Sequence, residues 1–399
     1  MKGSFEIGFF MIRKYTPKIG IVGTGYIGSG LKRTIDRLPD MTISCILTQR
    51  NLNEFADDHR YTNSVQELID KSDLVVECNG NPVYATEVLC QVIDASLPVV
   101  TMDSELHITS GSFLASKGFI TEAEGDQPGA IAALNKNLVE VGFKPIVFGN
   151  IKGFLKLDPT PEEMAYWAKI QGISIEQVTG ATDGTKIQIE QAFVANGLGA
   201  TIAKQGLLGY ESTSIDEGSK LLAEQAKNLG YPISDYLLCS PKAQPRLPAG
   251  VFIAAEYDET EIPTLRYLKL GEGPFYTFLK HYHLVYLDIP VTIRQVLRGD
   301  GVLLNNSLKP SSSVLAVAKK KLKPGEVINR IDRNFQIRGE AVSIGSAPNH
   351  VPFGLIDKAV IKRNVEPGQV IEYDDVEIPP SKAWDGWMFT LDLLAKNVT

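Results

Sequence analysis

The feature that most constrains the fold is a glycine-rich turn between a short buried strand and a helix. Residues 18–22 are mainly apolar, Gly23, Gly25 and Gly28 follow them, and apolar residues then recur at helical spacing. In a G-x-G-x-x-G turn, the first glycine permits the tight bend, the second lets the backbone approach a diphosphate, and the third lets the helix pack on the strand. The sequence therefore predicts a dinucleotide-binding site. Its expected contact residues are Gly23, Gly25, Tyr26, Ile27 and Gly28.

Strands and helices alternate after this turn, which is typical of a doubly wound parallel sheet. A strand at residues 145–150 is expected to close the region, so we place a doubly wound Rossmann domain of the α/β class at residues 1–150. The other patterns predict strands at 42–47, 73–78, 98–102 and 118–121, and helices at 65–69 and 84–95.

The end of the second strand bears on the choice of cofactor. NAD-binding domains of this kind place a carboxylate there, roughly 20 residues past the glycines, to bind the ribose 2′-hydroxyl. Here Thr48, Gln49, Arg50 and Asn51 stand instead, and a guanidinium suits the 2′-phosphate of NADP. We therefore expect Arg50 to select NADPH, with NADH as the alternative cofactor. The competing interpretation of Arg50 is a solvated loop residue.

A central region follows over residues 151–310. Helical patterns at 160–172, 185–199 and 219–229, and an aromatic, β-branched stretch at 267–290, predict an α+β domain. The first of these helices carries clear start signals, because Thr160 can cap it and Pro161 stands at its first position.

The last region, residues 311–399, contains an internal repeat. Segment 320–328 is echoed by segment 363–371, and each copy has a Pro-Gly turn followed by a Val-Ile pair. Such a repeat predicts a small β-rich domain, which either covers the active site or joins subunits. We interpret the basic run 319–321 as a solvated strand or loop.

Charge and cysteine content exclude several classes of partner. A formal net charge of −7 argues against nucleic acid and anionic membranes. The four cysteines are scattered without metal-ligand spacing and are interpreted as buried thiols. An apolar run at residues 7–12 is too short to span a bilayer and is expected to precede the first strand. We therefore expect a cytoplasmic protein with a small-molecule substrate.

Several motifs carry a family resemblance that extends from residue 18 to about residue 380. Segments 99–105, 121–129 and 149–153 resemble the homoserine-dehydrogenase-like oxidoreductases. Asp183-Gly184-Thr185-Lys186 with Glu190, together with the C-terminal repeat, is similar to their deoxyxylulose-phosphate-reductoisomerase-like branch, whose last part resembles a SAF (antifreeze-like) domain. A lysine that homoserine dehydrogenases have after the strand at 99–101 is missing, because Met102 and Asp103 stand there.

The resemblance implies a nicotinamide-dependent reduction of a small polar carbonyl, with the active site between the first domain and a central catalytic and dimerisation domain. The reductoisomerase-like branch also implies a carbon-skeleton rearrangement before hydride transfer. Asn79 and Gly80, which follow a strand end, are expected near the nicotinamide ribose. We further expect a homodimer or a higher homo-oligomer.

Lys186 is the main candidate for the chemistry. Reduction of a carbonyl needs a proton donor and a positive charge near the developing alkoxide, and a lysine can supply both. Asp183, Lys186 and Glu190 lie at positions i, i+3 and i+7, so they share one face if the helix begins by Asp183. We therefore predict catalytic roles for all three residues. The alternative is an ordinary solvated ion-pair helix.

Glu122, Glu124 and Asp126 form an acidic cluster just after a predicted strand end. Ligands gather at such ends in open α/β sheets. We predict a catalytic role for Glu124 and substrate binding by Glu122, Asp126 and Lys152. A divalent cation, Mg²⁺ or Mn²⁺, held by Glu124, Asp126 and Glu190 is a further candidate; otherwise the carboxylates pair with lysines.

Two other candidates receive structural interpretations. His281 and His283 fall on one face of a predicted strand and are expected to form a core or interface pair, with a proton relay or phosphate ligand as the alternative. Cys78 follows a strand, but no histidine base stands near it in the sequence, so a catalytic thiol is disfavoured.

The sequence thus predicts an NADPH-dependent oxidoreductase, either a reductase or a reductoisomerase, that acts on a small hydroxylated or phosphorylated carbonyl. Two alternatives remain open: a homoserine dehydrogenase, and a non-catalytic nucleotide-binding or assembly protein.

Overall fold

The computed structural model describes residues 15–330 and 333–396; the apolar run at residues 7–12 lies outside them. The first sheet has six parallel strands in the order β3-β2-β1-β4-β5-β6, which confirms the doubly wound α/β fold. The order reverses between β1 and β4, and ligands bind at such a switch point. The strands are β1 (Lys18–Val22), β2 (Thr42–Leu47), β3 (Tyr61–Thr62), β4 (Leu74–Glu77), β5 (Val99–Thr101) and β6 (Ile120–Glu122).

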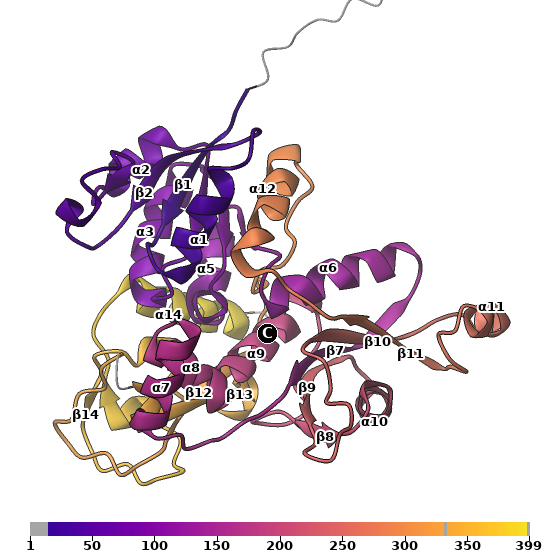
Figure 1. Cartoon of the computed structure of the whole chain (residues 1–399). Coiled ribbons are helices and arrows are strands. Elements are labelled where there is room, and N and C mark those ends of the chain that lie inside the picture. Colours follow the sequence, from indigo (N-terminus) through magenta and orange to yellow (C-terminus); the bar gives the residue numbers. More distant parts are fainter. Residues whose placement is uncertain (1–14, 331–332, 397–399) are drawn as a thin grey trace, which may run out of the picture.

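Helices cover both faces of this sheet (Figure 1). One face packs against α2 (Val65–Lys71), α3 (Pro82–Asp94) and α5 (Ser112–Lys117). The other packs against α1 (Tyr26–Ile35) and α12 (Ile289–Arg298). Because α12 follows the whole central region in the sequence, the chain leaves the first sheet after β6 and returns to it at Ile289.

The second sheet is mixed, in the order β11-β10-β7-β9-β8. Its β7 pairs in parallel with β9 and antiparallel with β10. The expectation that residues 145–150 close the first sheet is therefore wrong. A buried apolar run fits either sheet, and the strands that pair with β7 stand far downstream. The strands are β7 (Lys144–Lys152), β8 (Tyr210–Ser212), β9 (Ile233–Cys239), β10 (Gly250–Glu256) and β11 (Phe275–Lys280).

Helix α9 lies at the centre of the molecule, between the second sheet and the C-terminal strands (Figure 1). Within residues 185–196, Lys186 alone is not buried. The helix expected at residues 160–172 is confirmed, with a capping box at Thr160. The helices of this part of the chain are α6 (Gln127–Glu140), α7 (Pro161–Gln171), α8 (Ile175–Thr182), α9 (Thr185–Leu198), α10 (Ile215–Leu229) and α11 (Ile262–Tyr267).

The C-terminal region forms a small β-rich module, as the repeat predicts. The two repeat copies pair with each other, because Leu322 and Val365 exchange backbone hydrogen bonds. Gly325 and Gly368 occupy equivalent turns with φ of 86° and 83°. Helix α14 packs on α3 and α5 of the first domain. The elements are β12 (Ser312–Ala318), α13 (Arg333–Gln336), β13 (Ile337–Ser343), β14 (Val360–Ile361), β15 (Val376–Glu377) and α14 (Lys382–Lys396).

All four cysteines are buried and unpaired, in line with the sequence-based interpretation. Within residues 15–330 and 333–396, no helix has both the length and the apolar character needed to cross a membrane.

Candidate active site

The glycine turn lies at the switch point of the first sheet, against the loop that follows β4. A Cβ at Gly28 would lie 2.2 Å from the carbonyl oxygen of Gly23, and one at Gly23 would lie 2.8 Å from that of Cys78. Both positions are therefore closed to larger residues. At Gly25, no heavy atom lies within 4 Å of the Cβ position. The N-terminus of α1 at Gly25 is thus open to an approaching diphosphate.

Arg50 follows β2 at the same edge of the sheet. Its side chain is 55% exposed, pairs with Glu54 and lies over the ring of Phe55, 5.0 Å from the ring centroid. Nearby, the hydroxyls of Thr24 and Thr48 are 3.2 Å apart and connect the glycine turn to the end of β2. The guanidinium is therefore available to a phosphate, provided that the phosphate displaces Glu54.

Buried Glu77 fixes the loop after β4, where Asn79 and Gly80 lie. Its carboxyl group accepts hydrogen bonds from the backbone N–H of Asn79, at 2.5 Å, and from the hydroxyl of Thr101, at 2.8 Å. The Thr101 hydroxyl accepts in turn from the N–H of Asp103. Burial, and next the charge of Asp103, raise the pKa of Glu77 to about 8. One side chain thus couples the loops after β4 and β5.

Lys186, at the start of α9, reaches across to the loop after β6. Its Nζ lies 3.0 Å from Asp126 and 3.2 Å from Glu190, and the side chain is 42% exposed. Desolvation alone would lower the pKa of Lys186, but the two carboxylates outweigh it and hold the pKa well above its ordinary value. Lys186 is therefore a fixed cation with an exposed surface. Such a group stabilises negative charge and is a poor source of protons at neutral pH.

Glu190, almost fully buried, organises the floor of this cluster. It accepts a hydrogen bond from Asn150 Nδ2 at 2.9 Å, and Lys152 Nζ lies 3.5 Å away. Asp126 adds a second carboxylate beside Lys186. Burial would raise the pKa of Asp126, but Lys186, with a smaller contribution from His283, lowers it overall. Two lysines therefore face two carboxyl groups where the two domains meet.

The loop that carries Asp126 depends on glycine. A Cβ at Gly125 would lie 2.2 Å from the carbonyl oxygen of Val285, and Gly125 has φ of 141°. Thr292 of α12 accepts a hydrogen bond from the N–H of Glu124 at 2.8 Å, and the Glu124 carboxylate pairs with Lys280 of β11. The returning segment thus holds the acidic cluster in place.

Glu122 and His107 lie beneath the cluster and are fully buried. His107 Nε2 is 3.3 Å from Glu122 Oε2, without hydrogen-bond geometry. Burial, followed by the charges of Asp126 and Asp103, raises the pKa of Glu122, while burial lowers the pKa of His107 to about 3. Burial therefore favours the neutral form of both groups. The Glu122 carboxyl group is not exposed, so a substrate could contact it only if the surrounding side chains moved. Substrate binding by Glu122 remains a prediction.

The expected alignment of Asp183 with Lys186 is wrong. Gly184 has φ of 87°, so α9 begins at Thr185, and Asp183 ends α8 instead. The Asp183 carboxylate lies 2.7 Å from Lys319, whose side chain is only 5% exposed. Lys319 is thus not the solvated residue that the basic run suggested. Any role of Asp183 in catalysis would be indirect, through the start of α9.

The donor set does not fit a divalent cation. Glu124 is paired with Lys280, and the ammonium of Lys186 lies where a cation between Asp126 and Glu190 would have to bind. Among the residues that the structure describes, no three His, Cys, Asp or Glu side chains form a group that could hold a metal ion.

Four residues of the site were not among the predicted site residues: Asn150, Gln127, Lys280 and His283. Asn150 and Lys280 contact glutamates 40 and 156 residues away. Gln127 can donate to Glu190 at 3.1 Å once its amide is turned. The sequence predicts a core or interface role for His283, whereas the structure places it close enough to Asp126 for its charge to lower the pKa of that carboxyl group. These residues can be identified only once the folded domains bring their side chains into contact with Glu124, Asp126 and Glu190.

A doubly wound sheet with a glycine turn, facing a second domain that brings a lysine and carboxylates to its edge, defines a two-domain dinucleotide-dependent oxidoreductase. Residues 125–289 match the family model of the catalytic domain of oxidoreductase DRL. The match begins in the acidic loop and ends where α12 returns to the first sheet. The expectation of an oxidoreductase is thereby confirmed.

Solved structures give more distant likenesses, and a search of curated proteins finds no match. A probable dehydrogenase from Thermotoga maritima is 13% identical, with a TM-score of 0.40, over 72% of this chain and 91% of that one. Scyllo-inositol dehydrogenase from Lactobacillus casei, with bound NAD(H) and scyllo-inositol, is 10% identical, with a TM-score of 0.42, over 73% of this chain and 92% of that one. At these values the likeness carries no argument about the ligands of this chain.

Proposed function

We propose that this chain is a nicotinamide-dependent oxidoreductase that uses NADPH to reduce a small hydroxylated or phosphorylated carbonyl, with or without a prior rearrangement. The observation that carries the proposal is the cation of Lys186, held between Asp126 and Glu190 at the carboxyl edge of the glycine-turn sheet. The open helix N-terminus at Gly25 fits a dinucleotide diphosphate at the same edge. The match of residues 125–289 to an oxidoreductase catalytic domain supports the same assignment.

In this proposal the bound nicotinamide supplies the hydride, and the chain supplies position and charge. Lys186, with Lys152 beside it, binds the carbonyl oxygen or a phosphate of the substrate and stabilises the negative charge that develops there. Because Lys186 holds its own proton firmly, the alkoxide takes its proton from solvent, which reaches the partly exposed Lys186 side chain. Asp126 and Glu190 keep Lys186 ionised and fix its direction. Glu124 is held by Lys280 at the rim, where it can accept hydrogen bonds from substrate hydroxyls. A homo-oligomer remains a prediction.

Arg50 supports NADPH over NADH, because its guanidinium stands where a carboxylate would select the 2′-hydroxyl. We expect kcat/KM to be at least tenfold higher with NADPH. Arg50→Ala should remove most of this preference, about tenfold, by weakening NADPH and leaving NADH unchanged. Arg266→Ala is the matched control, because Arg266 is an exposed arginine of α11, in the second domain, and its ion pair is with Glu272.

The test measures nicotinamide oxidation across aldoses, ketoses, their phosphates and aspartate semialdehyde, in parallel with nucleotide binding. Turnover of one phosphorylated or hydroxylated carbonyl supports the proposal. Equal use of NADH by the parent enzyme would refute the choice of NADPH. Binding without turnover of any substrate would refute the enzymatic proposal, and turnover of aspartate semialdehyde alone would favour a homoserine dehydrogenase. Activity that disappears on exhaustive chelation would contradict the conclusion that the carboxylates bind no metal.

A further inference from the structure

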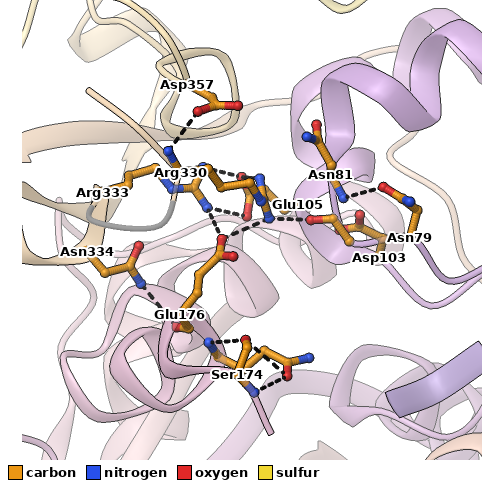
Figure 2. Close-up of polar contacts among 12 residues, drawn as sticks. Asn79, Asn81, Asp103, Glu105, Ser174, Glu176, Arg330, Arg333, Asn334 and Asp357 are labelled. Carbon is orange, nitrogen blue, oxygen red and sulfur yellow. Dashed lines mark hydrogen bonds and ion pairs between the residues drawn. The ribbon is translucent and has the colours of Figure 1, made fainter. Parts of the chain in front are cut away.

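Two arginines of the C-terminal module reach the loops beside the glycine turn (Figure 2). Arg330 donates a hydrogen bond from Nη2 to the carbonyl oxygen of Gly80, in the loop directly after β4. Arg333 makes a two-point contact with Glu105, at 2.7 and 3.0 Å. Glu105 belongs to α4 (Ser104–Leu106), which follows β5. One module thus holds two successive loops at the carboxyl edge of the first sheet.

The central domain completes the cluster through Glu176 of α8. Its carboxylate lies 2.9 Å from Arg330 and 3.2 Å from Arg333 (Figure 2). Three parts of the molecule therefore meet in one ionic network: the loops of the first domain, α8, and the C-terminal module. Burial would raise the pKa of Glu105, but the charges of Arg333 and Arg330 lower it overall, so this carboxylate is ionised.

The two arginines differ in their surroundings. Arg333 is 2% exposed and stacks on Phe353 of its own module, 4.2 Å from the ring centroid. Arg330 is 21% exposed, and its own backbone is tied to Asp357 at 2.8 Å. Arg333 is therefore the buried anchor, whereas Arg330 is an arm that reaches from the module to the β4 loop.

The loop that Arg330 contacts is the one that faces the glycine turn. A Cβ at Gly23 would lie 3.0 Å from the Cα of Asn79, so the two segments form opposite walls of the switch point. Within the first domain, Asn79 is fixed by Glu77 and by the N–H of Asn81. Gly80 has φ of 74° and no heavy atom within 4 Å of its Cβ position, so its outer side is open.

We propose that Arg330 is a positioning residue of the dinucleotide site, through which the C-terminal module holds the loop of residues 79–81 in its binding conformation. This inference rests on the proposed nicotinamide cofactor. The loop faces the part of the site that NADH and NADPH share, whereas Arg50 faces only the 2′-phosphate. Loss of Arg330 must therefore weaken both cofactors equally, while loss of Arg50 weakens NADPH alone.

The test compares the full-length parent with Arg330→Met, Arg330→Lys and Arg363→Met. Arg363 is an exposed arginine of the same module that pairs with Asp375, so its replacement is the matched control. Fluorescence titration should show that Arg330→Met raises Kd for NADPH and NADH by about tenfold each, with kcat nearly unchanged. Arg330→Lys should recover part of this loss, because an ammonium can still donate one hydrogen bond to Gly80.

Amide hydrogen exchange provides a readout that does not depend on bound cofactor. In the free protein, Arg330→Met should speed exchange at residues 79–81 and leave the melting temperature within a few degrees. If the exchange rates at residues 79–81 do not change in Arg330→Met, the inference about Arg330 is overturned, whether or not the parent binds a nucleotide. If the parent binds no nucleotide, the proposed function is refuted separately. Equal Kd values in parent and variant would also overturn it. If Arg330→Met does not fold, the same comparisons with Arg330→Lys decide, at a smaller expected effect.

Discussion

The glycine turn and the Lys186 cluster occupy the same edge of the first sheet but are built in opposite ways. The turn offers backbone and empty space: the Cβ position of Gly25 has no neighbour within 4 Å. The Lys186 cluster offers charge, with Asp126 and Glu190 at 3.0 and 3.2 Å. The turn is complete within six residues and one neighbouring loop, whereas the cluster joins side chains that stand far apart in the sequence.

This difference indicates a division of labour. The turn can bind a cofactor wherever a strand meets a helix in this way, because backbone N–H groups and the helix dipole bind the diphosphate. The cluster exists only while the second domain is docked on β6 and α12, since Thr292 and Lys280 hold the acidic loop. Cofactor binding should therefore tolerate changes in the docking of the second domain better than catalysis does.

The largest expected effect comes from Lys186→Met. The variant loses the cation that faces the substrate and leaves Asp126 and Glu190 without it, so kcat should fall by about 10²- to 10³-fold while Kd for NADPH changes little. Steady-state kinetics and nucleotide titration measure the two quantities.

Lys156→Met is the control for Lys186→Met, because Lys156 is exposed and its ion pair with Glu163 lies on the surface. Lys186→Arg should retain more activity than the methionine variant, since it keeps the charge. If kcat of Lys186→Met stays within threefold of the parent, Lys186 does not act on the substrate, and the contrast between the two regions fails.

Two alanine substitutions in the glycine turn separate folding from binding. At Gly28, a Cβ would meet the Gly23 carbonyl at 2.2 Å. Overpacking costs about 1–3 kcal/mol, which exceeds the helix-propensity gain of about 1 kcal/mol, so Gly28→Ala should lower the unfolding free energy. Gly25 has φ of −73° and ψ of −164°, which alanine adopts freely. Gly25→Ala should therefore leave stability within about 0.5 kcal/mol and raise Kd for NADPH about tenfold.

Chemical denaturation and nucleotide titration read out the two substitutions. An unchanged Kd in Gly25→Ala would mean that the diphosphate does not approach position 25. A Gly28→Ala variant as stable as the parent would mean that α1 can shift away from the turn at little cost.

The contrast between the local glycine turn and the Lys186 cluster, which joins distant residues, also explains which features the sequence could predict. Strands, capped helices and the glycine turn follow from patterns within about ten residues, as at Thr160 and Gly23. The strand at residues 145–150 was assigned to the wrong sheet because a buried apolar run does not specify its partners. Asp183 was misaligned because the positive φ of Gly184 delays the start of α9. The partners of Asn150, Lys280 and Arg330 depend on the docking of whole domains, which no local pattern encodes.

The smallest expected effect concerns Glu77, which lies between the two regions. Burial, and next the charge of Asp103, raise its pKa from 4.5 to about 8. Between these values the folded state binds one proton more than the unfolded state, so this contribution to stability is full below pH 4.5 and is lost as pH rises through 8. The unfolding free energy should therefore fall with pH, by at most about 1.4 kcal/mol per unit from this group.

Glu77→Gln removes this titration and retains an acceptor for the N–H of Asn79, so its stability should depend less on pH between 6.5 and 8. The pKa of His107 is lowered to about 3, so its contribution to stability has the opposite sign and falls as pH drops through 6.5. Both proteins contain His107, so this contribution cancels in the comparison. Glu163→Gln is the control, because hydrogen bonds from Lys156 and Thr160 lower the pKa of this exposed carboxyl. Urea unfolding at several pH values measures the slopes. If the unfolding free energies of the parent and Glu77→Gln change with pH in parallel, Glu77 is ionised in the folded state. A negative charge would then lie between the loop of residues 79–81 and the Lys186 cluster.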